Sequence, residues 1–281
     1  MPPMSLAPSC LIDPPPPEKT SLDPTKSVVA FPGGGLFFWW QAGFIRQRQK
    51  QGLLFADAYM VGASAGALSA VLAKCNVDMD FAFERALQLC DDKEVWTRPV
   101  GLLGTWGSIV RQWLDDLLPE DAADLCRGNV FVLVTVVEDI SAFRHGRPIL
   151  SRRRISDFAD RQELIDCCMA SVHIPFFMDG RAFHTEFRGL CLVDGSFLPS
   201  PEDLTVMNRL QGHSSEAQPG AHRPLDHTVD HKVDASLSDQ AFVQLKPSAE
   251  LVRELMTRGG AFAAAAHPHS STGGRTTEVK E

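Results

Sequence analysis

The first candidate for chemistry is a serine flanked by small residues. Residues 62–66 read Gly-Ala-Ser-Ala-Gly, a GxSxG pattern centred on Ser64. An apolar segment precedes the pattern and an Ala-rich segment follows it, which is the strand-turn-helix context of a nucleophile elbow. Gly62 and Gly66 keep the sharp turn free of bulky side chains, and the helix that follows presents its positive dipole end to developing negative charge. The alternative interpretation is a small-residue turn where a helix and a strand pack closely.

A glycine run forms a second candidate, about thirty residues earlier. Gly33, Gly34 and Gly35 follow the apolar segment SVVAF and precede a helix-length segment. Glycines allow backbone amides to turn toward a bound oxyanion, because a Cβ would resist the required angles and crowd the ligand. The run therefore predicts an oxyanion loop beside the elbow. A nucleotide loop is the alternative, but neither a Gly-Lys-Ser/Thr sequence nor GxGxxG spacing is present.

A serine hydroxyl is a weak nucleophile until a neighbouring base accepts its proton. Asp194 closes an apolar segment, LCLVDG, and Gly195 allows a tight turn that aims the carboxylate back at Ser64. An aspartate with an ordinary pKa of about 3.9 is a feeble base, so partial burial must raise that pKa. These residues predict a Ser-Asp dyad, whereas Asp194 taken alone would favour an ordinary Asp-Gly turn.

A Ser-Asp-His triad is the alternative arrangement of the same site. The chain order Ser, Asp, His is the one that α/β-hydrolases use. It would require a histidine after Asp194, such as His213 in a polar stretch. The histidines that precede Asp194 are as consistent with structural roles as with catalysis; they are His145, His173 and His184.

Strands and helices alternate around these residues, which predicts an α/β fold with a mostly parallel sheet. The predicted strands are 27–31, 58–62, 129–139 and a pair within 182–195 that ends on Asp194. The predicted helices are 35–52, 65–74, 78–90, 108–118 and 160–171. Parallel strands of this kind carry both glycine-rich turns at the same edge of the sheet, where a site can form.

Composition sets limits on the function. A formal net charge of −8 and a pI near 5.6 argue against nucleic-acid binding. The seven cysteines have neither CxxC pairs nor adjacent histidines, so they predict reduced thiols and no metal site, and we expect no cofactor. The N-terminus has the features of neither a secretory signal nor a transit peptide, and no stretch approaches the roughly 20 apolar residues that span a bilayer.

Three regions are predicted along the chain. Residues 1–26 are rich in proline and predict a disordered leader. Residues 27–210 are predicted to form one domain, which carries Ser64 and Asp194. Residues 211–281 lose apolar periodicity and predict a poorly ordered tail with one helix at 248–258, which either packs on the domain or stays detached.

Together the motifs resemble the patatin-like phospholipases. The segment FPGGGLFFWWQAG is especially similar to the adiponutrin-like branch, and DFADRQELIDCCMASVHIPFF is similar to the family's segment ahead of the aspartate. The resemblance covers roughly residues 27 to 200. It implies a three-layer α/β/α fold, a catalytic Ser-Asp dyad of Ser64 and Asp194, an oxyanion loop of Gly33 to Gly35, and no metal.

Two positions depart from the family's pattern. Phe37 stands where many members carry Arg or Lys, and Ser196 makes the aspartate motif DGS instead of DGG or DGA. The first departure favours, as an alternative to catalysis, a weak or inactive protein that acts as a lipid-binding or lipid-droplet surface module. The second is a small change that the site should tolerate.

The resulting expectation is a serine lipid acyl hydrolase of the phospholipase A or acylglycerol lipase type, acting through an acyl-enzyme. We expect it in the cytoplasm, with a glycerolipid substrate at a membrane or lipid-droplet surface; protein partners are not predictable. Residues 36–40, Leu-Phe-Phe-Trp-Trp, indicate either a buried helix or a membrane-facing surface. A dyad enzyme should survive a cut after Pro201 if the tail is loose, whereas a triad enzyme would lose its histidine.

Overall fold

The computed structural model describes residues 23, 26–53, 55–139, 149–198, 227–234, 237 and 244–266. The strands are β1 (Val28–Phe31), β2 (Tyr59–Ala63), β3 (Val130–Asp139), β4 (Ile149–Ile155), β5 (Leu192–Val193) and β6 (His227–Thr228). The α-helices are α1 (Phe38–Lys50), α2 (Ala65–Lys74), α3 (Met79–Asp92), α4 (Trp106–Leu117), α5 (Ala122–Cys126), α6 (Arg161–Ser171) and α8 (Ala249–Ala266). Short 3-10 helices within the described ranges are η1 (Gly35–Phe37) and η3 (His231–Val233).

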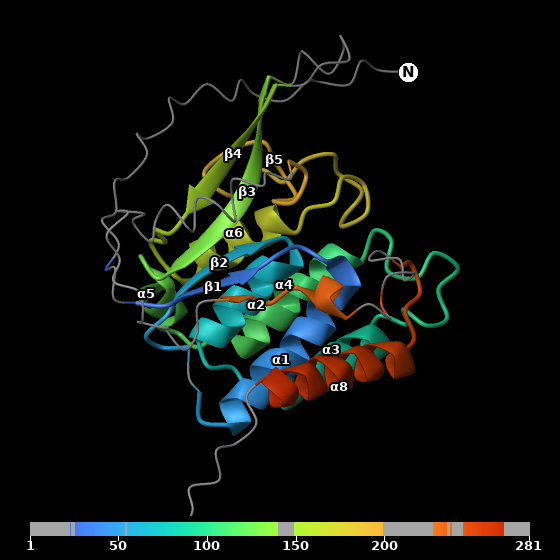
Figure 1. Ribbon diagram of the computed structural model, residues 1–281. Helices are drawn as coiled ribbons and strands as arrows, with labels where there is room; N and C mark the ends of the chain where they lie inside the picture. Colours follow the sequence, from blue (N-terminus) through green and yellow to red (C-terminus); the bar gives the residue numbers. More distant parts are fainter. Residues whose placement is uncertain are drawn as a thin grey trace, which may run out of the picture.

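The sheet is open and mostly parallel, in the order β4-β3-β2-β1-β6 (Figure 1). β1, β2, β3 and β6 run parallel, whereas β4 and β5 pair antiparallel with β3. The chain moves from β1 to β2 to β3 in one direction across the sheet. Right-handed connections in one direction place their helices on the same face. The expected mixed α/β fold with a mostly parallel sheet is confirmed.

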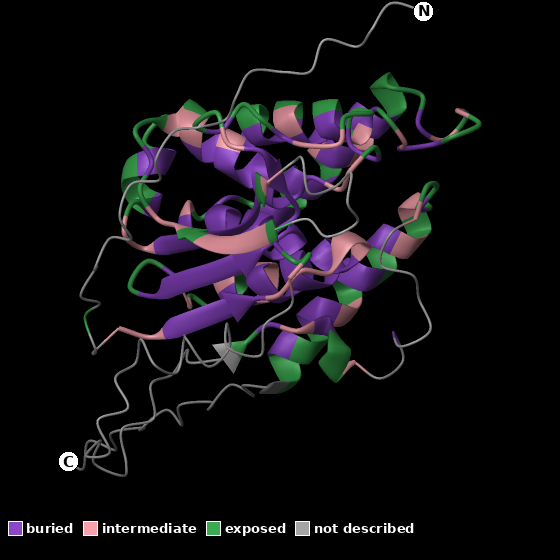
Figure 2. Ribbon diagram, turned by 90° about the horizontal axis from the view of Figure 1, so that it is seen from above, coloured by how far each residue is buried: buried purple, intermediate pink, exposed green. Residues whose placement is uncertain are grey.

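The helices that the structure describes contribute to one large core on a single face of the sheet. Alternate strand residues enter that core, among them Val29 and Met60, and their neighbours Ala30 and Val61 form a second buried cluster on the other face. Burial on both faces explains why β3 reads as the continuous apolar run VFVLVTVV. Figure 2 shows the central strands and the inner surfaces of the helices buried together. A helical layer over the second face, which a three-layer arrangement requires, is not among the described residues.

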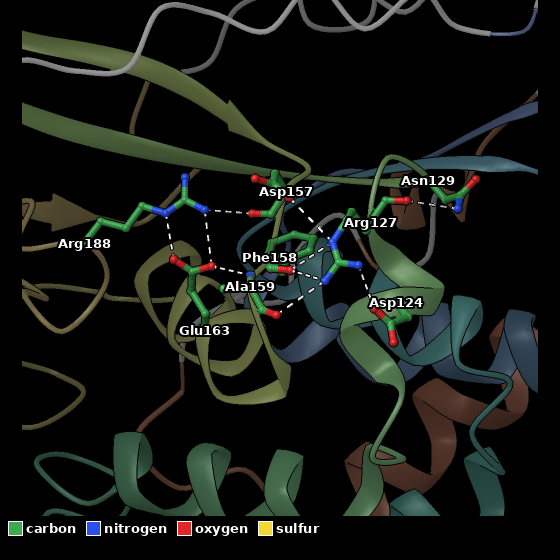
Figure 3. A network of polar contacts seen from close by, with 8 residues as sticks. All are labelled: Asp124, Arg127, Asn129, Asp157, Phe158, Ala159, Glu163 and Arg188. Carbon is green, nitrogen blue, oxygen red and sulfur yellow. Dashed lines mark hydrogen bonds and ion pairs between the residues drawn. The ribbon is translucent and has the colours of Figure 1, made fainter.

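Helix α6 is fastened at its N-terminus by a polar network (Figure 3). Arg127 donates from Nε to the carbonyl of Phe158 at 3.1 Å, and Glu163 accepts from the Ala159 amide at 2.6 Å. Glu163 also accepts from Arg188 Nε at 2.8 Å. These contacts fix the direction of α6, whose last residue reaches the functional site.

The C-terminal part of the chain packs on the domain. Helix α8 crosses α1 so closely that a Cβ at Gly43 would lie 1.9 Å from the Met256 carbonyl oxygen, and one at Gly259 would lie 1.8 Å from that of Trp40. Figure 1 shows α8 alongside α1. β6 extends the sheet beside β1.

These contacts change the picture of the expected tail. The helix predicted at 248–258 is present and extends over Ala249–Ala266, and of its two expected arrangements it takes the packed one. The segments 211–226 and 267–281, like nearly all of the leader 1–26, lie outside the described residues. The division into three regions stays a prediction. No helix within the described ranges is both long enough and apolar enough to cross a membrane.

Candidate functional site

Ser64 lies at the turn between β2 and α2, with backbone angles φ 53° and ψ −129°. A positive φ is uncommon for a residue with a side chain and costs about 1–3 kcal/mol, so surrounding contacts must hold it. One such contact is the Ser64 amide, which donates to the Ser171 hydroxyl at 2.9 Å. The strained turn lifts the Ser64 side chain out of the helix line, as a nucleophile elbow requires.

Gly62 and Gly66 are each required for a different steric reason. A Cβ at Gly62 would lie 2.2 Å from the Gly66 carbonyl oxygen. A Cβ at Gly66 would lie 1.9 Å from the carbonyl oxygen of Phe31 in β1. Any other residue at either position would push the α2 N-terminus away from the strands. The close packing of helix against strand and the sharp turn at Ser64 therefore occur together, and both require the two glycines.

Strand register brings Asp194 to Ser64. In β2, which is parallel to β3, the last residue Ala63 pairs with Leu133. In β5, which is antiparallel to β3, the last residue Val193 pairs with Thr135. The two strands therefore end facing each other along one side of β3, a single residue apart. The Ser64 hydroxyl donates to Asp194 Oδ2 at 2.5 Å.

Burial dominates the electrostatics of Asp194. The side chain is buried, and loss of hydration raises the pKa of its carboxyl group above the ordinary value. Hydrogen bonds from the Ser64 hydroxyl and from Ser196, together with the charge of Arg152, act in the opposite direction. Among the described residues, the hydrogen-bond donors to the carboxylate are Ser64 and Ser196. A raised pKa makes the carboxylate a better proton acceptor than an exposed aspartate.

Ser171, the last residue of α6, joins both halves of the site. Its hydroxyl accepts from the Ser64 amide and donates to the Leu133 carbonyl at 2.7 Å. Its own carbonyl accepts from the Gly195 amide at 2.8 Å. A Cβ at position 195 would lie 2.0 Å from the carbonyl oxygen of Leu133 in β3. Only glycine therefore fits at this position, directly after Asp194.

The glycine run lies next to Ser64. A Cβ at Gly33 would lie 3.2 Å from Ser64 Cβ and 2.0 Å from Ser196 Oγ. Gly35 has a φ of +52°, which favours glycine. The loop closes through a hydrogen bond from the Phe37 amide to the Gly34 carbonyl at 3.0 Å. The two predicted glycine-rich turns and Asp194 therefore meet in space.

An apolar cavity of about 120 Å³ opens beside Ser64. An engineered apolar cavity of about 150 Å³ takes up benzene, so a hydrophobic group fits a space of this kind. Aliphatic and aromatic side chains from α1, α2, α3 and α4 form about half of the wall. Val172, Ile174 and Phe177, which follow α6, contribute to it as well, and so do Pro247 and Val252 from the C-terminal segment. The cavity suits an apolar part of a ligand whose reactive group lies at Ser64.

The segment Leu36–Trp40 belongs to the interior. Phe37, Phe38, Trp39 and Trp40 are all buried, and Trp39 lines the cavity. The buried-helix interpretation is correct, and the membrane-facing one is wrong for these side chains.

Of the four histidines considered for a triad, the structure describes two, His173 and His184. His173 and His184 are buried, and burial lowers the pKa of each imidazole. His173 contributes a backbone carbonyl that accepts from the Asp194 amide at 2.9 Å. His145 and His213 lie outside the described residues.

Two residues of the site were absent from the sequence prediction. Ser171 occupies an unremarkable position at the end of a helix, and no local pattern distinguishes it from other serines. His231 reaches the glycine loop from the C-terminal segment, where its ring stacks on Phe37 with centroids 3.9 Å apart. Both contacts depend on tertiary structure, so spacing along the chain could not reveal them.

Comparison with known proteins identifies the family of the chain. A family model described as patatin-like phospholipase matches residues 29–205. The omega-hydroxyceramide transacylase of Mus musculus is 27% identical over 177 residues, which is 62% of this chain and 27% of that protein. The human 1-acylglycerol-3-phosphate O-acyltransferase PNPLA3 is 29% identical and covers 63% of this chain and 36% of its own length. Human patatin-like phospholipase domain-containing protein 5 is 30% identical over 58% of this chain and 36% of its length. The chain spans about a third of the length of these relatives.

Proposed function

The chain belongs to the patatin-like phospholipase family, whose members are lipid acyl hydrolases and acyltransferases, and from that premise we propose that it cleaves fatty acyl esters with a Ser64-Asp194 dyad. The observation that supports this most directly is the 2.5 Å hydrogen bond from the strained Ser64 to the buried Asp194. A nucleophile and its base need this hydrogen-bond distance. The apolar cavity beside Ser64 supports a fatty acyl chain as the group that is bound.

The reaction divides into two steps. Asp194 accepts the Ser64 proton as Oγ attacks the ester carbonyl, and it then passes that proton to the departing alkoxide, so that the alcohol leaves and an acyl-enzyme forms. The regenerated carboxylate deprotonates a water molecule that attacks the acyl-enzyme, and the proton passes to Ser64 Oγ as the fatty acid is released. The strongest stabilisation of such a reaction comes from donors fixed around the developing oxyanion.

Those donors are assigned by elimination among nearby amides. The Ser64 amide already donates to Ser171, so it is not available to the oxyanion. The glycine loop at Gly33, Gly34 and Gly35 and the N-terminus of α2 remain, and a helix N-terminus has amides without intrahelical partners. We assign the oxyanion hole to these two elements. Neither the mechanism nor the site requires a metal or a cofactor.

The acyl acceptor separates two candidate functions. The relatives named above include a transacylase and an acyltransferase, which pass an acyl group to an alcohol. The same acyl-enzyme would serve both reactions, with water or a lipid alcohol in the second step. A glycerolipid at a membrane or lipid-droplet surface facing the cytoplasm is the substrate we propose for either.

Labelling with a serine-directed fluorophosphonate tests the proposal. We expect the protein to be labelled at Ser64 and to release fatty acid from phospholipid or acylglycerol vesicles. Ser64→Ala should abolish labelling and reduce turnover by on the order of 10⁴ or more, as removal of a serine nucleophile does elsewhere. Asp194→Asn should lower both rates while the fold is kept.

The control is Ser108→Ala, which removes an exposed serine of α4. Undiminished turnover in folded Ser64→Ala would overturn the proposal, and an unlabelled wild-type protein that still binds vesicles would favour a lipid-binding module. Product analysis with a monoacylglycerol present decides between hydrolysis and acyl transfer.

A further inference from the structure

Successive glycines of the oxyanion loop face different neighbours. The Cβ position of Gly33 faces Ser64 and Ser196. The Cβ position of Gly34 faces His231, with 3.0 Å to its Cε1 atom. The loop is therefore packed between the nucleophile on one side and an imidazole ring on another. A group that packs against the loop on the side away from Ser64 also limits how far the loop amides can move from Ser64.

The ring of His231 fits this place closely. It stacks on Phe37 with centroids 3.9 Å apart and an interplanar angle of 13°, and the residue is only 8% exposed. Phe37 closes the loop through its hydrogen bond to the Gly34 carbonyl. The imidazole ring of His231 thus packs against both Gly34 and Phe37, the first and last residues of the turn.

The segment carrying His231 is itself held against the loop. Its strand β6 pairs with β1, the strand that leads into the glycine run. Gln41 Nε2 donates to the carbonyls of Pro32 at 2.9 Å and Val229 at 3.2 Å, which joins the start of the loop to the end of β6. Arg258 of α8 forms an ion pair with Asp234 at 3.0 Å, just after η3. His231 therefore has a fixed position relative to the loop.

We propose that His231 is a positioning residue that holds the glycine loop in the conformation needed for oxyanion binding. The proposal rests on the proposed function, because it concerns the same site. His231 acts through packing on Gly34 and Phe37, and no proton transfer is assigned to it. Oxyanion donors act only when they are placed within tenths of an ångström, so a loosened loop lowers the rate of the chemical step. His231 lies outside residues 29–205, the part of the chain matched by the family model.

Substitution of His231 tests this role in the full chain. In His231→Ala we expect kcat on a soluble short-chain ester to fall about tenfold or more with KM little changed, since the loop acts on the transition state. The rate of fluorophosphonate labelling should fall in parallel. In His231→Phe the flat ring is kept, so both rates should recover most of the loss. Lys232→Ala, an exposed neighbour in the same turn, is the matched control and should behave like the wild type.

A second readout is independent of activity. Hydrogen exchange of the amides at 33–37 should become faster in His231→Ala and return toward the wild-type rate in His231→Phe. If His231→Ala does not fold, His231→Leu replaces it, because leucine keeps apolar bulk without a flat ring. Unchanged exchange and kcat in a folded Ala or Leu variant would overturn the proposal. So would a loss that His231→Phe fails to rescue. If Ser64 proves unreactive in the wild type, the proposed function fails, and the exchange rates still decide whether His231 fixes the loop.

Discussion

At the scale of single residues, Ser196 connects Asp194, the proposed base, to the glycine loop, the proposed oxyanion hole. Its amide donates to Asp194 Oδ1 at 2.7 Å, and its hydroxyl also lowers the pKa of that carboxyl group. The same hydroxyl oxygen occupies the space beside Gly33. The serine of the DGS sequence thus opposes part of the increase in pKa that burial produces.

Ser196→Ala should therefore shift the pH dependence of turnover. Asp194 must be ionised to accept the proton, and removal of a hydrogen bond to the charged form raises its pKa. We expect the acidic limb of the kcat/KM profile to move to higher pH, with little change on the plateau. A pH-rate series on a soluble ester measures this, with Ser108→Ala as control. An acidic limb that stays in place or moves to lower pH would show that the Ser196 hydroxyl does not act on Asp194.

The residues that sequence could predict are those with a local signature. Gly62, Ser64 and Gly66 lie within five consecutive residues, and their spacing reflects a turn whose steric limits are set within those residues. Asp194 is identified less directly, because its approach to Ser64 depends on where β2 and β5 end along β3. Ser171 and His231 have no local signature. Their roles follow from how α6 and η3 pack, which no periodicity encodes.

Adjacent glycines of α8 offer a test at the scale of elements. A Cβ at Gly259 would meet the Trp40 carbonyl oxygen at 1.8 Å, whereas one at Gly260 would have its nearest neighbour at 3.4 Å. Gly259→Ala should lower the free energy of unfolding by about 1–3 kcal/mol, the usual cost of overpacking. Gly260→Ala should raise it by up to about 1 kcal/mol, because alanine favours the helix. Urea denaturation of the two variants measures both, and equal effects would mean that α8 does not cross α1 as described.

The same crossing explains why α8 extends past its predicted end. Two consecutive glycines inside a segment argue against a helix on propensity alone, but here they allow contact between two backbones.

Strand β4 was missed in the sequence because its local pattern does not predict a strand. Its sequence ILSRRRI lacks apolar alternation, yet antiparallel pairing with β3 holds it at the sheet edge. Arg152 in this strand donates to the Leu198 carbonyl at 2.7 Å, so its guanidinium has a structural contact.

At the scale of the whole molecule, the C-terminal segment belongs to the folded unit that contains the site. β6 lies at the edge of the sheet, His231 packs against the glycine loop at Gly34, and Val252 lines the cavity. The family match ends at residue 205, before all of these. An expectation that the enzyme survives a cut after Pro201 depended on a loose tail, and the packing of α8 removes that premise.

A chain ending at Pro201 should therefore lose most of its stability and its activity. Removing α8 exposes the surfaces that bury Val252, Leu255 and Met256, and burial of three such side chains contributes about 5–9 kcal/mol. Domains of this size are stable by only about 5–15 kcal/mol, so little would remain. The control is a chain ending at Ala266, which keeps every contact of α8 given above and should match the full chain. Thermal denaturation and fluorophosphonate labelling of the two truncated chains measure the difference. A chain ending at Pro201 that melts and reacts like the full protein would show that residues 1–201 fold without α8 and that the loop needs no support from His231.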